Sequence, residues 1–137
     1  MTSPRLVPEL VCSDLQRSLA FHTGVLGFTI AFRREEESFA YLEREGAELM
    51  LQGPTERLFL AGELQPPYGR GINLQIEASD VDQLHQAVMA AGAPVYLAME
   101  EKWYRRDQML LGNRQFIVQD PDGYLLRFFR DLGSRPV

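Results

Sequence analysis

Polar and charged side chains alternate with apolar ones in several short segments of this 137-residue chain. Leu74 and Ile76, for example, alternate with polar neighbours, and this period of two predicts a strand with one face against a core. The side chains expected on the other face are Glu9, Val11, Glu48, Met50, Gln52, Asn73, Gln75, Glu77, Leu125, Arg127 and Phe129. Carboxylates, amides, one guanidinium and apolar groups together are typical of a small-molecule pocket. The alternative is an ordinary solvated sheet face.

A carboxylate on that face, such as Glu9 or Glu77, has the chemistry of a general base. The two histidines, His22 and His85, fall within predicted helices instead. Neither has a Ser, Cys or carboxylate at a spacing that indicates a catalytic triad. We therefore expect structural histidines and assign no catalytic residue.

Trp103 is the only tryptophan, and it is followed directly by Tyr104. The flanking residues Lys102, Arg105 and Arg106 are basic. An aromatic pair in a charged segment is either a stacking platform for a ligand or an anchor in a subunit interface. The sequence leaves both interpretations open.

These side chains need elements to position them, and one pattern of elements occurs twice. A strand over Leu6–Cys12 runs into Asp14, and a strand beginning at Ile72 runs into Asp80. Each Asp is a predicted helix N-cap, for helices over 14–26 and 80–91, and a Gly follows the end of each helix.

Further strands are expected in each half after the helix. In the first half they cover 28–33, 38–42 and 47–52, and in the second half 94–97, 115–119 and 124–130. Residues 100–113 are charged and aromatic, which indicates a loop or an irregular strand. We expect a single α+β domain over 1–137, with a βαβββ module in 4–52, a linker in 53–71 and a second βαβββ module in 72–131.

Composition limits the partners of the chain. The formal net charge is -5, which disfavours nucleic acid and anionic membranes and is compatible with a cationic small molecule. No apolar run approaches the length of a membrane span, and no signal-peptide pattern opens the sequence. Cys12 is the only cysteine, so we expect a reducing, cytoplasmic environment.

The repeated pattern resembles the vicinal-oxygen-chelate superfamily, which includes glyoxalase I and the bleomycin-resistance proteins. The segments that carry the resemblance are DLQRSLAFHTGVLGF at 14–28 and RQFIVQDPDGYLLRFF at 114–129. It covers nearly the whole chain. It implies two βαβββ modules whose curved sheets form a cup, a homodimer, and a ligand in the cup or in a groove between subunits.

Metal enzymes of that superfamily take His and Glu ligands from fixed strand positions. The equivalent positions here are Val7, Asn73 and Arg127, with Met50 as the fourth, or Glu48 or Gln52 if the first-half alignment shifts. Catalytic zinc or iron needs about three His, Asp, Glu or Cys ligands. The resemblance therefore implies a protein without a metal or other cofactor.

The metal-free bleomycin-resistance branch is the better match. It shares Val7-Pro8 and an aromatic residue where this chain has Phe32, whereas its stacking Trp corresponds to Gly112 here. The resemblance implies a metal-free protein that sequesters an aromatic, preferably cationic ligand. The predicted ligand-binding residues are Phe32, Trp103, Tyr104, Glu9, Glu48, Asn73, Gln75 and Arg127. The alternatives are a lyase, isomerase or dioxygenase, a metal-free enzyme, and a housekeeping module.

Overall fold

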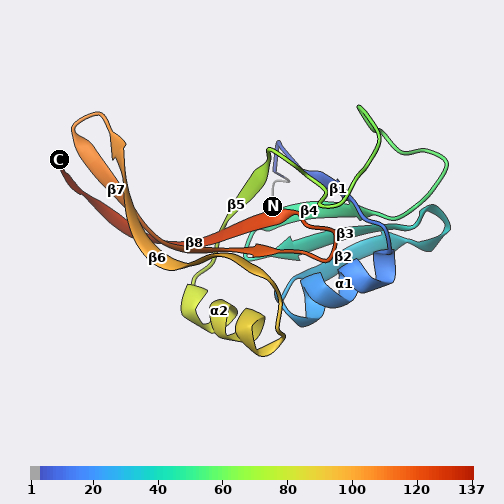
Figure 1. The fold of residues 1–137 in the computed structure, drawn as a ribbon, viewed down its shortest axis with the longest axis horizontal. Coiled ribbons are helices and arrows are strands. Elements are labelled where there is room, and N and C mark those ends of the chain that lie inside the picture. Colours follow the sequence, from blue (N-terminus) through green and yellow to red (C-terminus); the bar gives the residue numbers. More distant parts are fainter. Residues whose placement is uncertain (1–3) are drawn as a thin grey trace. The chain divides into compact units, whose positions relative to one another are not determined.

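The computed structural model describes residues 4–137 and divides into two compact units. Unit 1 comprises the chain up to Tyr68 together with Pro121–Gly123, and unit 2 comprises Gly69–Asp120 and Tyr124–Val137. Figure 1 labels the elements of both units. Among the described residues, no helix has the length and apolar character needed to cross a membrane.

Unit 1 is a four-stranded sheet with one helix. Its elements are β1 (Glu9–Val11), α1 (Leu15–Gly24), β2 (Thr29–Arg34), the 3-10 turn η1 (Glu35–Glu37), β3 (Phe39–Arg44) and β4 (Ala47–Gln52). The strand order is β1-β4-β3-β2. β1 pairs parallel with β4, whereas β2, β3 and β4 pair antiparallel in sequence order.

Unit 2 repeats this plan. Its elements are β5 (Asn73–Glu77), α2 (Val81–Ala90), β6 (Val95–Arg106), β7 (Met109–Gln119) and β8 (Leu125–Pro136). The strand order β5-β8-β7-β6 corresponds strand for strand to that of unit 1. The parallel β5–β8 pair corresponds to the β1–β4 pair. The predicted α+β fold with two tandem βαβββ modules is therefore confirmed.

Both helices begin where the sequence predicted. The Asp14 carboxylate accepts a hydrogen bond from the backbone N–H of Arg17 at 3.1 Å, and Asp80 accepts one from Gln83 at 3.0 Å. These bonds satisfy amides of the first turn that have no partner within the helix. Helix α1 ends at Gly24 rather than at the predicted Leu26.

Each helix covers one face of its own sheet with apolar side chains. Leu15, Leu19 and His22 of α1 are buried, and so are Val81, Leu84 and Val88 of α2. In unit 2 they pack on strand residues that alternate with the polar ones, including Ile76, Phe116, Leu126 and Phe128. Met89 of α2 is 57% exposed and lies outside this buried set.

Residues 100–113, predicted as a loop or an irregular strand, form strands joined by a short turn. They belong to the long hairpin of β6 and β7, which has a register shift between Leu97 and Glu100 but pairs regularly from Glu100 to Arg106. β8 continues beside β7 to Pro136. The outer part of this three-stranded ribbon, residues 102–112 and 133–136, is called the arm below. The arm extends beyond α2 in Figure 1.

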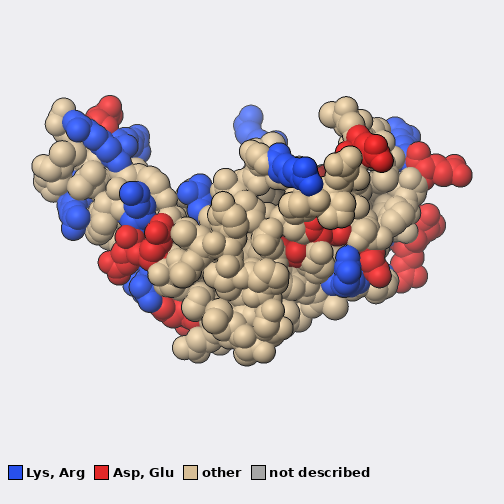
Figure 2. All heavy atoms as spheres, viewed as in Figure 1, with Lys and Arg blue, Asp and Glu red and all other residues tan. Residues whose placement is uncertain are grey.

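The arm lacked a sequence signal because no helix covers it. Most of its side chains are exposed, so apolar residues do not alternate with polar ones. Figure 2 shows Lys and Arg side chains gathered around the arm at the upper left. The basic residues of the arm are Lys102, Arg105, Arg106 and Arg135.

His22 makes the stability of the protein depend on pH. Its ring is fully buried, and Nδ1 lies 2.8 Å from the carbonyl oxygen of Ser18. Burial lowers the pKa of His22 below its ordinary value of 6.5, although the Ser18 hydrogen bond and the Asp122 charge oppose the shift. The unfolded chain therefore takes up a proton at a higher pH than the folded chain does, and stability is lost as the pH falls below 6.5.

We predict that the urea concentration at the unfolding midpoint decreases as the pH is lowered from 7.5 to 5.5. The slope for this one group approaches about 1.4 kcal/mol per pH unit at most. In His22→Asn, the side-chain amide retains a donor for Ser18 but does not titrate, so the pH dependence should flatten. Equal slopes in the variant and the wild type would show that His22 is not the responsible group.

Candidate functional site

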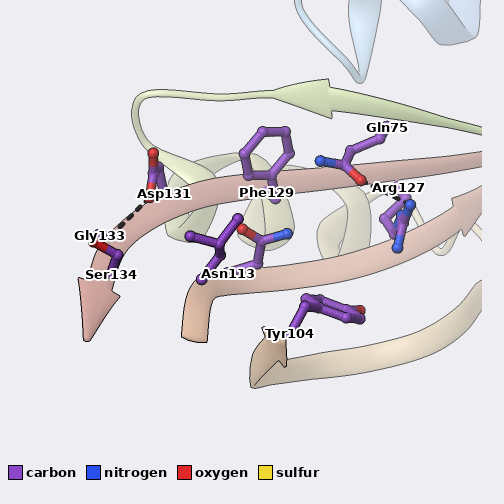
Figure 3. A pocket seen from close by; sticks show the side chains of 9 residues that line it. Gln75, Tyr104, Asn113, Arg127, Phe129, Asp131, Gly133 and Ser134 are labelled. Atoms are coloured by element: carbon purple, nitrogen blue, oxygen red, sulfur yellow. Dashed lines mark hydrogen bonds between the residues drawn. The ribbon is translucent and has the colours of Figure 1, made fainter. Parts of the chain in front are cut away.

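The main candidate site is a pocket on the sheet of unit 2, on the face opposite α2. We call this side of the sheet the pocket face. The cavity has a volume of about 610 Å³. It is lined by Gln75, Tyr104, Leu111, Asn113, Arg127, Phe129, Asp131, Gly133 and Ser134. Figure 3 shows their side chains, which come from all four strands of the unit.

Strand alternation and register bring these residues together. Gln75 of β5 lies opposite Arg127 of β8, and Asn113 of β7 lies opposite Asp131. Their neighbours Ile76 and Phe128 point the other way and are buried. The pocket face therefore carries the polar set that the period-two pattern predicted, including the predicted residues Gln75 and Arg127. Asn73 lies on the same face of β5 but does not line the pocket.

Arg127 is the only basic residue among those lining the pocket. One terminal nitrogen, Nη2, donates a hydrogen bond to Oε1 of Gln75 at 2.7 Å. Within residues 4–137, Nε is buried without a hydrogen-bond partner, and no carboxylate pairs with the guanidinium. A guanidinium keeps its charge at any physiological pH. The pocket therefore contains a positive charge that the described chain does not neutralise.

Tyr104 is positioned by a buried amide. Gln115 is 1% exposed, and its Nε2 donates to the hydroxyl oxygen of Tyr104 at 2.6 Å and to the carboxylate of Glu100 at 2.8 Å. These bonds fix the tyrosine ring against the pocket. Asn113, Gln115 and Asp131 were not assigned to the site from the sequence. Asn113 lay in a segment without a strand pattern, Asp131 lay one residue beyond the predicted strand 124–130, and Gln115 opened the predicted strand 115–119 but was not among the residues expected on the polar face.

Trp103 lies on the opposite side of β6 from Tyr104. Its ring packs over Gly112, where a Cβ atom would come within 2.6 Å of the indole. The guanidinium carbon of Arg135 lies 4.0 Å from the centre of the Trp103 ring. Trp103 and Tyr104, predicted in a loop or an irregular strand, lie in β6, and of the two only Tyr104 lines this pocket.

The remaining predicted site residues belong to unit 1. Phe32 is 48% exposed, and its ring stacks on Tyr41 with centroids 4.9 Å apart. The Tyr41 hydroxyl donates to the carboxylate of Glu48 at 2.7 Å, and this bond raises the pKa of Tyr41 above its ordinary value of 10.0. Phe32 and Glu48 are thus linked through Tyr41.

Glu9 lines a smaller cavity of unit 1, with a volume of about 340 Å³. Arg34 lies in its wall, bonded to Glu37 at 2.7 Å and placed 3.9 Å from the ring centre of Phe39. The Gln52 amide donates to backbone oxygens, including that of Glu37 at 2.6 Å. Because several of its polar groups already bind one another, this cavity is less suited to a ligand than the pocket of unit 2.

The resemblance to metal enzymes implies ligands at the positions that carry Val7, Asn73 and Arg127 here. Among residues 4–137, no three His, Cys, Asp or Glu side chains are gathered in a way that could hold a metal ion. His22 lies inside unit 1, and His85 packs edge-on against Phe116 at 5.0 Å. Both histidines lie in helices, as the sequence predicted.

Residues 5–128 match the family described as the Glyoxalase/Bleomycin resistance protein/Dioxygenase superfamily. The chain belongs to this superfamily. Another member, a bleomycin resistance protein of Geobacillus stearothermophilus, is 24% identical over 137 aligned positions, which cover 93% of this chain and 97% of that protein.

Solved structures agree with the superfamily fold. TioX from Micromonospora sp. ML1 is 25% identical, with a TM-score of 0.72 over 92% of this chain and 98% of its own. FosX, a fosfomycin resistance protein from Listeria monocytogenes, is 18% identical, with a TM-score of 0.61 over 94% of this chain and 92% of its own. At that identity, the likeness to FosX concerns the fold alone.

We predict that Gly112→Ala displaces the Trp103 ring, because the added methyl group would occupy its place. Losing the contact with Arg135 should cost about 0.5–1 kcal/mol of stability. The fluorescence of Trp103, the only tryptophan, should shift to longer wavelength as the ring enters water. Gly24→Ala is the matched control, since a Cβ there meets nothing within 4 Å. Unchanged emission in Gly112→Ala would contradict the close packing.

Proposed function

We propose that this protein is a metal-free small-molecule-binding protein of the bleomycin-resistance type. It sequesters an aromatic, drug-like or natural-product ligand, which we expect to carry a cationic group. The ligand lies on the pocket face of unit 2, within a groove that a homodimer completes. Arg127, Gln75 and Tyr104 are the residues proposed to contact it there.

The pocket of unit 2 is the observation that supports this proposal most. Its volume of about 610 Å³ falls in the range of roughly 300–1,000 Å³ that is usual for small-molecule sites. Tyr104, Leu111 and Phe129 offer apolar contact, whereas Asn113 and Arg127 offer hydrogen bonds. Aromatic surface with a few polar groups favours a flat ligand that is oriented at its edges.

The relatives support the same class of function. The Geobacillus stearothermophilus relative is named a bleomycin resistance protein, and it aligns over nearly its whole length. We carry over the class, a protein that binds a small molecule, and leave the choice of ligand to experiment. Fold likeness by itself does not transfer a function.

The enzyme alternative receives less support from the geometry. Glu9 and Glu77, the carboxylates considered as bases, are exposed to solvent. A general base active near neutral pH is usually buried in apolar surroundings or placed beside a charge that shifts its pKa. Glu9 and Glu77 are not buried in apolar surroundings.

The proposal can be tested by measuring the melting temperature of the protein with metals, bleomycin-class drugs and aromatic cations. We predict that at least one of the organic compounds raises it. A ligand at 100 times its Kd stabilises the native state by about 2.7 kcal/mol. Phe129→Ala should lower the affinity for that ligand about tenfold, because it removes an aromatic contact of about 1.4 kcal/mol.

Tyr96→Ala is the control for that measurement. Tyr96 is 65% exposed on β6 and does not line the pocket, so its removal should leave the affinity unchanged. If neither the organic panel nor any metal shifts the melting temperature, the sequestration proposal fails. Stabilisation by a transition metal alone would favour a metal enzyme instead.

We predict a homodimer at micromolar concentration. Edge strand β2 is exposed along its whole length, including Ile30 and Phe32, and Phe59 in the segment between the modules is 75% exposed. Pairing with a second copy would cover apolar groups of this kind. Phe32, Glu9 and Glu48 stay proposed ligand contacts within the dimer groove. Sedimentation equilibrium measures the mass, and a value near the 15.6 kDa of one chain would refute the dimer.

A further inference from the structure

We infer that the pocket of unit 2 selects a dipolar aromatic ligand, with a carboxylate or similar oxyanion bound by Arg127 and a cationic group bound by Asp131. This inference rests on the proposed function and names the class of ligand. It adds an anionic group to the expected aromatic cation, and it gives the ligand one direction in the pocket.

The first step concerns the free side of Arg127. Gln75 accepts from Nη2 only, so the N–H groups of Nη1 have no described acceptor. Gln75 also holds the guanidinium on the pocket face, which reduces the ordering that a ligand must impose. The planar fork of N–H donors of a guanidinium binds a carboxylate with better geometry than the single point charge of an ammonium group does. The unpaired guanidinium is therefore the natural end of the pocket for an oxyanion.

The second step concerns Asp131. It is the only acidic residue among those lining the pocket, and its Oδ1 accepts from the backbone N–H of Gly133 at 2.7 Å. Among residues 4–137, no Lys or Arg forms an ion pair with it. Its second oxygen, Oδ2, has no described donor, so the carboxylate retains both a charge and an acceptor for an ammonium group.

The third step is the spacing of the two charges. Arg127, Phe129 and Asp131 alternate along one regularly paired stretch of β8, so all three face the pocket. Four residues of strand separate the two charged Cα atoms by about 13 Å. Figure 3 shows the Phe129 ring between Asp131 and Arg127. The order along the strand is thus positive, aromatic and negative, which complements a ligand that is negative, aromatic and positive.

The charged neighbours leave this polarity intact. On the pocket face Glu77 lies opposite Phe129, and Glu100 is bonded to Gln115. Lys102 of β6 lies opposite Asn113 of β7, which lies opposite Asp131 of β8, so one strand separates Lys102 from the strand of the carboxylate. Arg130 and Glu101 point to the other side of the sheet, near Arg114 and Asp82. None of these groups forms a described ion pair with Arg127 or Asp131.

Isothermal titration calorimetry, which measures the affinity for each of three matched probes, tests the inference. The first is 4′-(aminomethyl)biphenyl-4-carboxylate, which carries both charges. Its methyl ester lacks the anion, and its N-acetyl derivative lacks the cation. We expect the dipolar probe to bind the wild-type protein about tenfold or more tightly than either derivative. Arg127→Gln should abolish its advantage over the ester, and Asp131→Asn should abolish its advantage over the N-acetyl derivative.

Arg130→Gln and Glu101→Gln are the charge-matched controls, since both positions face away from the pocket, and they should retain the wild-type preferences. Equal affinities for the three probes, or preferences unchanged in Arg127→Gln and Asp131→Asn, would overturn the inference while the proposed binding function stands. If no probe binds and the panel of drugs and aromatic cations also fails to stabilise the protein, the proposed function and the inference fail together.

Discussion

The parallel pairing of β5 with β8 is the constraint on which the candidate site depends. It joins the first and last strands of the second module and sets Gln75 opposite Arg127, 52 residues away in sequence. A shift of one residue in that register would turn Arg127 towards α2 and Phe128 towards the pocket. The buried row of Ile76, Leu126 and Phe128 opposes such a shift, because α2 covers it. The apolar packing on one face thus determines the polar chemistry on the other.

Unit 1 has the same arrangement of strands but offers a different surface. Its first and last strands also pair in parallel, with Glu9 opposite Met50. Several of its polar groups, however, are bound to one another, as Tyr41 is to Glu48 and Arg34 is to Glu37. In unit 2 the charges of Arg127 and Asp131 have no described counter-ion. Two modules with one topology therefore differ in the polar contacts that each makes internally.

Much of the fold could be predicted because its signals are local. An Asp before an apolar stripe marked both helices, and alternation marked β4, β5 and the inner part of β8. β6 could not be predicted beyond Leu97, because the arm has no covering helix and its sequence no longer alternates. The direction of Trp103 depends on the register shift between Leu97 and Glu100, which no pattern in the sequence reveals. Alternation puts Trp103 and Tyr104 on opposite faces of any strand, but the sequence does not reveal which of the two faces the pocket.

The contact between Trp103 and Gly112 has a consequence for how this sequence can evolve. The resemblance to the bleomycin-resistance branch implies a tryptophan at the position of Gly112, whereas here the only tryptophan, Trp103, stands opposite it on the paired strand. Even a methyl group at 112 would meet the indole at 2.6 Å, so a side chain at 112 and the present position of the Trp103 ring exclude each other. The two residues are therefore epistatic: the cost of a side chain at position 112 depends on which residue stands at position 103.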